Sequence, residues 1–159
     1  TPNVATGSFP LWSPDGRKLL FSKSDGLYIH RLADGMEVKV VDAPGVASTV
    51  NTHLGLSQDG SLLGWTQPSL SRLLVYRIAS WEPFAMDFMA EFTEPGKSMY
   101  WPVFSTDNRY VAAEHIRRDV SGAAVENTVV AYDLRTLQKK EIADLNAYNA
   151  DFTFLTDWR

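Results

Sequence analysis

One short segment near the start of the chain, from Phe9 to Ser22, constrains the fold more than any other. Its flanks are aromatic and aliphatic, as buried strands require, and its centre reads Ser13-Pro14-Asp15-Gly16. Proline presets φ for a turn, aspartate bonds to the local backbone, and glycine accepts a positive φ. The segment therefore predicts two strands joined by a tight turn.

This pattern occurs three times. The second copy runs from His53 to Trp65 and the third from Trp101 to Ala112. Aligned on their shared serine, successive copies lie 44 and 48 residues apart. The third copy has Asn108 in place of the glycine, and asparagine is the next-best residue for a positive φ. A period of this length with several short strands per unit is typical of a β-propeller.

The rest of each unit repeats as well. A third strand is predicted at 27–32, 73–78 and 129–134, and a fourth at 37–41, 84–92 and 139–142. The predicted fold class is therefore all-β, a partial β-propeller over 1–159 with about three four-stranded antiparallel blades plus the start of a fourth. The blades are expected at about 9–41, 53–92, 101–142 and 151–159.

Two segments depart from the simple pattern. Apolar residues in 81–92 fit a helical stripe and an alternating strand almost equally, and the repeat register together with Pro83 favours the strand. Residues 114–128 form an insertion where the first unit has only a short turn. We expect Ile116 and Val125 to extend the hairpin between the second and third strands of the third unit outward, with 120–123 at its tip.

The repeat resembles that of TolB-type (WD-like) propellers, whose hallmark is a strand that ends in Trp-Ser-Pro-Asp-Gly and precedes a short apolar strand. The match at 12–16 is complete, the second copy has Gln58 in place of proline, and the third keeps Ser105 and Asp107. The resemblance covers nearly the whole chain. It implies the fold, whereas such blades serve TolB itself, prolyl-oligopeptidase-type enzymes and many other proteins.

Composition excludes several classes of function. The 159 residues carry a net charge of −4, which argues against nucleic acid as a partner. No apolar run approaches the roughly 20 residues that span a bilayer. The chain has no cysteine, so thiolate chemistry is excluded, and its first residue, Thr1, indicates a processed or partial chain.

No motif for catalysis, a cofactor or a metal is present, so we predict no enzymatic activity, no cofactor and no metal. The three histidines, His30, His53 and His115, are widely separated and have no paired metal-ligand spacing. There is no Gly-x-Ser-x-Gly segment and no glycine-rich phosphate loop. The repeated aspartates are single rather than clustered, so turn formation explains them better than a bound cation.

Partner binding is predicted at one face. In an up-and-down blade, the loop between the second and third strands leaves on the same side as the connection between blades, which places 46–53, 67–72, 97–100 and 117–122 together. The candidate partner-binding residues are His53, Tyr100, Trp101, Arg117, Arg118 and Asp119. A solvated loop is the alternative for the charged cluster, and packing between blades is the alternative for the aromatic residues.

The leading functional hypothesis is a protein-binding scaffold that is part of a larger assembly, and the TolB-type resemblance implies an extracytoplasmic, periplasmic location in a bacterium. The alternative is the non-catalytic propeller of a prolyl-oligopeptidase-type serine peptidase. Three blades would leave two apolar faces open, and we expect them to be lined by residues such as Leu19, Phe21, Phe152 and Phe154. The predicted partner is therefore another protein or the remainder of the same propeller.

Overall fold

The computed structural model describes residues 7–42, 52–67, 69 and 71–144, and these form three four-stranded antiparallel sheets. Blade one contains β1 (Ser8–Trp12), β2 (Lys18–Lys23), β3 (Gly26–Arg31) and β4 (Glu37–Asp42). Blade two contains β5 (His53–Leu56), β6 (Leu62–Gln67), β7 (Arg72–Trp81) and β8 (Phe84–Thr93). Blade three contains β9 (Ser98–Phe104), β10 (Tyr110–Arg118), β11 (Ala124–Asp133) and β12 (Lys139–Asp144).

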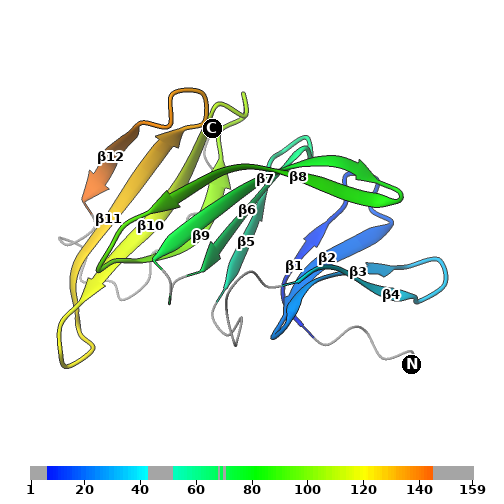
Figure 1. Cartoon of the computed structure of the whole chain (residues 1–159), viewed down its shortest axis with the longest axis horizontal. Coiled ribbons are helices and arrows are strands. Elements are labelled where there is room, and N and C mark those ends of the chain that lie inside the picture. Colours follow the sequence, from blue (N-terminus) through cyan, green and yellow to red (C-terminus); the bar gives the residue numbers. More distant parts are fainter. Residues whose placement is uncertain (1–6, 43–51, 68, 70, 145–159) are drawn as a thin grey trace.

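The strands of each blade are ordered as they occur in the chain, and the three blades stand side by side (Figure 1). In the ambiguous segment 81–92, Trp81 ends β7 and the residues from Phe84 onward form the strand β8, so the repeat register predicted a strand there correctly. The insertion extends the β10–β11 hairpin, as predicted, and Ile116 is fully buried in it. Blade three begins at Ser98, three residues earlier than expected, because β9 continues the ladder to Ile116.

Two apolar cores join the blades. Between blades one and two, Leu20 and Ile29 pack against Leu63 and Trp65. Between blades two and three, Val75 and Phe92 belong to the same buried cluster as Tyr132 and the inward face of β10. Alternate residues of each strand therefore supply the faces that hold neighbouring blades together.

The innermost strands of blades two and three approach closely. A Cβ atom on Gly55 would lie 1.9 Å from the carbonyl oxygen of Pro102, and one on Gly64 would lie 2.8 Å from the Pro102 Cβ. Any larger side chain at Gly55 would push β5 away from β9. This close contact fixes how β5 and β9 lie against each other, and therefore how the residues near the beginning of each strand are placed.

The repeated turn has the predicted chemistry in all three blades. In blade one, the Ser13 hydroxyl donates to Asp15 Oδ1 at 2.6 Å, and the backbone N–H of Lys18 donates to Ser13 Oγ at 2.9 Å. The equivalent bonds occur in the other two copies. Gly16, Gly60 and Asn108 have φ values of 68°, 70° and 57°, so the predicted positive φ is confirmed.

One expectation about the open face of blade one is wrong. Phe21 lies on the side away from blade two but is only 3% exposed, because the backbone of Gly7 lies against its ring. Leu19 is partly buried, whereas Trp12, its neighbour across the ladder, is 55% exposed. Phe152, Phe154 and the expected start of a fourth blade at 151–159 lie outside the described residues.

Candidate partner-binding surface

Four ring side chains from three blades meet at one end of the inner strands. The His53 ring stacks on Phe9 with centroids 4.3 Å apart, and it makes edge contacts with Trp101 at 3.9 Å and Tyr100 at 5.2 Å. Phe9 and Trp101 also contact each other, with centroids 5.6 Å apart. We call Phe9, His53, Tyr100 and Trp101 the ring cluster.

The backbone at two of these residues is strained. Phe9 and Trp101 have φ values of 55° and 51°, in a region that bulky residues rarely adopt. Each precedes a proline and lies where the strand ladder shifts register, at a bulge in β1 or β9. A proline cannot donate to the ladder, so it favours a bulge at that point. Such strain costs about 1–3 kcal/mol per residue and is concentrated at functional sites.

His53 forms the centre of the ring cluster. It is 5% exposed, and burial lowers the pKa of its imidazole to about 4, so the ring is neutral at pH 7. Its Nδ1 atom is buried and has no hydrogen-bond partner among the described residues. Phe9, Tyr100 and Trp101 are half-buried, so these residues are partly accessible from the surface. The cluster is therefore a partly exposed, largely apolar group of rings around a buried imidazole.

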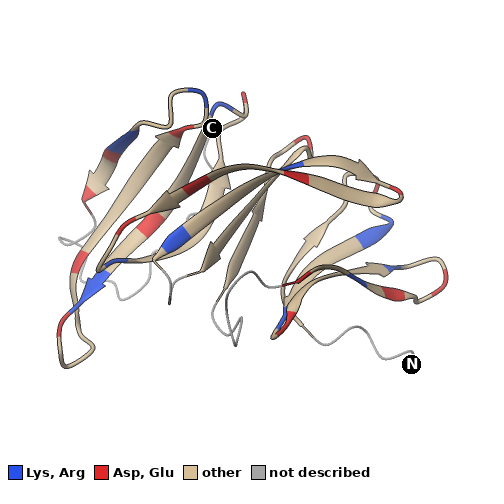
Figure 2. Cartoon of the chain, viewed as in Figure 1, with Lys and Arg blue, Asp and Glu red and all other residues tan. Residues whose placement is uncertain are grey.

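The long β10–β11 hairpin extends from the same end of the molecule (Figure 2). Glu126 accepts a hydrogen bond from Arg117 Nε at 2.9 Å, and it forms an ion pair with Lys97, which precedes β9. These contacts tie the hairpin to the strand that carries Tyr100 and Trp101. The Lys97 ammonium is the main reason that the pKa of Glu126 lies below its ordinary value.

The hairpin tip is closed by its own hydrogen bonds. Asp119 Oδ1 accepts from the Ser121 hydroxyl at 2.6 Å and from the backbone N–H of Ala123 at 3.1 Å, and the hydroxyl bond lowers the Asp119 pKa. Arg118 Nη1 donates to the Gly122 carbonyl at 2.9 Å. Asp119 thus organises the turn, while Arg117 is half-exposed beside Glu126. A role in partner binding stays a prediction for all three residues of the tip.

The structure brings together three of the six predicted residues, His53, Tyr100 and Trp101, and the repeat explains the fourth member of the ring cluster. Phe9, His53 and Trp101 each stand four residues before the repeat's serine. The local pattern around Phe9 indicates a strand but not a binding site. The shared repeat position was the signal that could have identified it. Predicted surface residues at 46–51 lie outside the described residues.

Among the residues that the structure describes, no group of three or more histidine, aspartate or glutamate side chains is placed to hold a metal ion. His30, His53 and His115 lie on three different blades. No helix in the described ranges is long and apolar enough to cross a membrane.

Comparisons with known proteins identify the architecture. No family model and no curated protein sequence matches the chain. Among solved structures, the β-propeller domain of Cps50 (Swd1) from Myceliophteria thermophila aligns with 87% of this chain at a TM-score of 0.61 and 14% identity. The chain folds as part of a β-propeller. TolB from Acinetobacter baumannii aligns with 85% of it at a TM-score of 0.56 and 19% identity.

Dipeptidyl peptidase 4 from Porphyromonas gingivalis aligns with 91% of the chain at a TM-score of 0.55 and 13% identity. The chain spans 40% of the Cps50 domain, 32% of TolB and 26% of the peptidase. The predicted likeness to TolB-type propellers is confirmed for the fold. Identities this low carry no function from these proteins to this one.

Proposed function

We propose that this chain is a non-enzymatic, protein-binding part of a propeller, and that its partner binds the end that carries the ring cluster and the β10–β11 hairpin. The observation that carries this proposal is the convergence of aromatic residues from blades one and three, two of them held in strained conformations, around a buried histidine of blade two. Aromatic residues at such positions supply large contact area at low entropic cost.

The neighbouring charges support a protein partner. The hairpin projects beyond the ring cluster and carries Arg117 and Arg118, and arginine is enriched in interface hot spots. An apolar centre beside a charged rim is the usual anatomy of a protein interface. The resemblance to TolB-type repeats supports an extracytoplasmic, periplasmic assembly as its setting.

The binding face is tested by paired charge reversals. We expect Arg117→Glu with Arg118→Glu, and separately Trp101→Ala, to reduce recovery of the partner when tagged protein is cross-linked and enriched from its native extract. The control is Arg17→Glu with Arg135→Glu, which makes the same charge change on exposed turns at the opposite end. If only the control pair, or changes at Asp15 and Asp59, abolished recovery, the proposed face would be wrong.

A second candidate is the non-catalytic propeller of a serine peptidase, which the structural similarity to dipeptidyl peptidase 4 favours. Both candidates predict that this chain has no hydrolase activity of its own, because no recognisable nucleophile–base pair exists in its sequence. Turnover of a peptide or ester substrate that one point mutation abolishes would contradict both. The gene's full length decides between them, since the second requires a hydrolase domain in the same polypeptide.

A further inference from the structure

The three blades stand side by side in an arc, and a cleft of about 360 Å³ lies on its outer rim. The cleft is between the outer strands of blade one and the tip of the β7–β8 hairpin. The strands β7 and β8 have ten residues each, whereas β3 and β4 have six. The longer hairpin extends over blade one, and its tip and the β3–β4 hairpin both lie at the right of Figure 1. The cleft is lined by Lys18, Ile29, Arg31, Val38, Lys39, Val40, Trp81, Glu82, Pro83 and Phe84.

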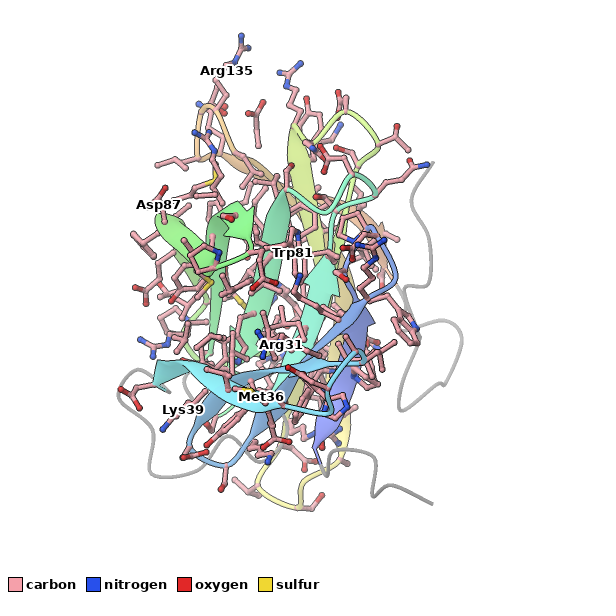
Figure 3. All side chains as sticks on the ribbon, turned by 90° about the vertical axis from the view of Figure 1, so that its right-hand side faces the viewer. Arg31, Met36, Lys39, Trp81, Asp87 and Arg135 are labelled. Atoms are coloured by element: carbon pink, nitrogen blue, oxygen red, sulfur yellow. The ribbon has the colours of Figure 1, made fainter. Side chains whose placement is uncertain are left out.

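The cleft has an apolar floor and a basic wall. Ile29 is buried, Trp81 and Phe84 are half-buried, and Val38 is 43% exposed. Arg31, Trp81 and the neighbouring Met36 face the same side of the molecule in Figure 3. The lining contains three cationic residues and one acidic residue, Glu82, while outside the lining Asp25 and Asp42 pair with Lys39, and Asp34 pairs with Arg31. A ligand that fits this lining has apolar side chains and a carboxylate that can replace that of Glu82.

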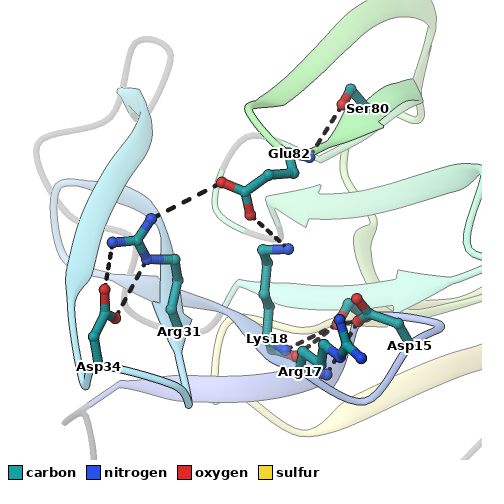
Figure 4. A network of polar contacts seen from close by, with 8 residues as sticks. Asp15, Arg17, Lys18, Arg31, Asp34, Ser80 and Glu82 are labelled. Carbon is teal, nitrogen blue, oxygen red and sulfur yellow. Dashed lines mark hydrogen bonds and ion pairs between the residues drawn. The ribbon is translucent and has the colours of Figure 1, made fainter.

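The pairing of Lys18 with Glu82 is asymmetric (Figure 4). The two charged groups are 2.8 Å apart, but the Lys18 side chain is only 10% exposed whereas that of Glu82 is 64% exposed. The cation is thus fixed within blade one, and its counter-ion reaches it from an exposed turn of another blade. A second carboxylate that displaced Glu82 would meet a largely desolvated ammonium group, where a charge-assisted hydrogen bond is strong.

Arg31 offers a second donor on the same wall. Its Nη2 and Nε atoms bind Asp34 at 2.5 Å and 3.3 Å, while Nη1 lies 3.9 Å from Glu82, beyond hydrogen-bond distance. Nη1 is therefore oriented toward the carboxylate position without a short contact there. A slightly displaced carboxylate can bind both Lys18 and Arg31.

The strand β4 forms one side of the cleft. Within the described part of the chain it pairs only with β3, so its other edge is open to an additional strand. The cleft itself lies over the sheet face beside that edge, because Lys18 pairs with Arg31 and Ile29 pairs with Val38 in the ladder, and all four residues line the cleft. An extended chain that enters past β4 can therefore lie over this face, where its side chains reach Lys18 and Arg31.

We propose that this cleft binds an extended peptide segment of a protein partner, in which a carboxylate side chain lies between two apolar side chains on the same face. The carboxylate takes the place of Glu82 on Lys18 and Arg31, and the apolar side chains contact Val38, Trp81 and Phe84. This site is on the rim of the arc and is separate from the ring cluster, so either can fail without the other.

The test uses a fluorescein-labelled peptide, Leu-Ser-Asp-Ser-Leu, whose first, third and fifth side chains share a face when extended. Fluorescence polarisation is measured with the purified chain and its variants. We expect Glu82→Gln to tighten binding about three- to fivefold, because it removes the competing carboxylate. Arg31→Gln and Lys18→Met should each weaken it about tenfold. Asp87→Asn and Arg135→Gln make the same charge changes at exposed positions outside the cleft lining, and should leave it unchanged.

A second peptide, with asparagine in place of aspartate, isolates the carboxylate and should bind at least about tenfold more weakly. Chemical-shift changes on binding should be concentrated in β4 and the β7–β8 turn. The proposal is overturned if neither the wild type nor Glu82→Gln binds the peptide, if the asparagine peptide binds equally well, or if Glu82→Gln changes only the melting temperature. That last result would make the Lys18–Glu82 pair a purely structural contact between blades.

Discussion

Asn108 Nδ2 donates a hydrogen bond of 2.8 Å to Asp59 Oδ2, so the repeated turn of blade three is joined directly to that of blade two. The turn of blade two is in turn packed on that of blade one, since a Cβ on Gly60 would lie 2.1 Å from Pro14 Cγ. The three copies of one local motif thus form a continuous row at one end of the arc. Residues that each turn needs for its own conformation also make the contacts between blades.

A comparison of Gly16 with Gly60 distinguishes the conformation of a turn from its contact with the turn of the next blade. Gly16 and Gly60 have nearly the same positive φ, but only Gly60 has a neighbour that a side chain would strike. We expect Gly16→Ala to lower the free energy of unfolding by about 1 kcal/mol through strain alone. Gly60→Ala should lower it by about 2–3 kcal/mol, because overpacking against Pro14 is added. Equal losses in urea denaturation would show that the contact between turns has no energetic weight.

The Asn108–Asp59 bond predicts a charge effect. Asn108→Gly keeps the backbone conformation but removes the donor, and should cost about 0.5–1.5 kcal/mol at pH 7. Asn108→Asp should cost more, because it places a second carboxylate beside that of Asp59, whose pKa is lowered to about 2 chiefly by the Ser61 backbone N–H. The gap between these two variants should narrow as pH is lowered toward 3. A gap that is independent of pH in denaturant titrations would contradict the proposed repulsion.

The buried His115 predicts a dependence of stability on pH. Burial between blades lowers its pKa from 6.5 to about 4, and Glu94, Lys97, Glu126 and Lys139 surround it with smaller, opposing effects. Between pH 6.5 and 4, the His115 imidazole is protonated in the unfolded chain but neutral in the folded chain. The contribution of the buried, neutral His115 to the free energy of unfolding is therefore complete only above pH 6.5. It is lost as pH falls toward 4, by up to about 3 kcal/mol.

The measurement compares unfolding free energies of the wild type and His115→Phe between pH 4 and 7. The variant should lose stability at pH 7, because Tyr132 loses its hydrogen bond at 3.0 Å to His115 Nε2, but its decline toward pH 4 should be shallower. His30→Phe, at a half-buried position in blade one, is the control. Parallel curves for the wild type and His115→Phe would exclude His115 as the source of the pH dependence.

The exposed apolar residues on the outer face of blade one lead us to predict that the chain associates with itself. Trp12 and Leu32 are 55% and 50% exposed. Trp12 pairs with Leu19 on the side opposite the core shared with blade two, and Leu32, which follows β3, bonds through its backbone N–H to the Arg17 carbonyl. We expect this face to pack against a further blade, so the chain alone should self-associate in sedimentation experiments. Trp12→Ser with Leu32→Ser should shift it toward monomer, and Phe88→Ser with Val120→Ser, also exposed, should not. A compact wild-type monomer that melts cooperatively would refute this prediction.

The sequence by itself determined the repeat, and with it the fold. Each turn residue acts through its own backbone and near neighbours, so Ser13, Gly60 and Asn108 could be assigned before any contact between blades was known. The strand β8 was resolved by comparison with the other copies, although its own periodicity was ambiguous. The turns and the strands could be predicted because the turn residues are neighbours in the sequence and the spacing of the repeat is visible along the chain.

Only the tertiary structure decided which residues meet. Phe9 and His53 are 44 residues apart, and their stacking depends on bulges and close strand contacts that no local pattern encodes. The burial of Phe21 beneath Gly7 and the Lys18–Glu82 pair at the rim were likewise invisible in the sequence. Such contacts arise from how whole blades pack, and side-chain packing at long range is fixed by three-dimensional geometry rather than by spacing along the chain.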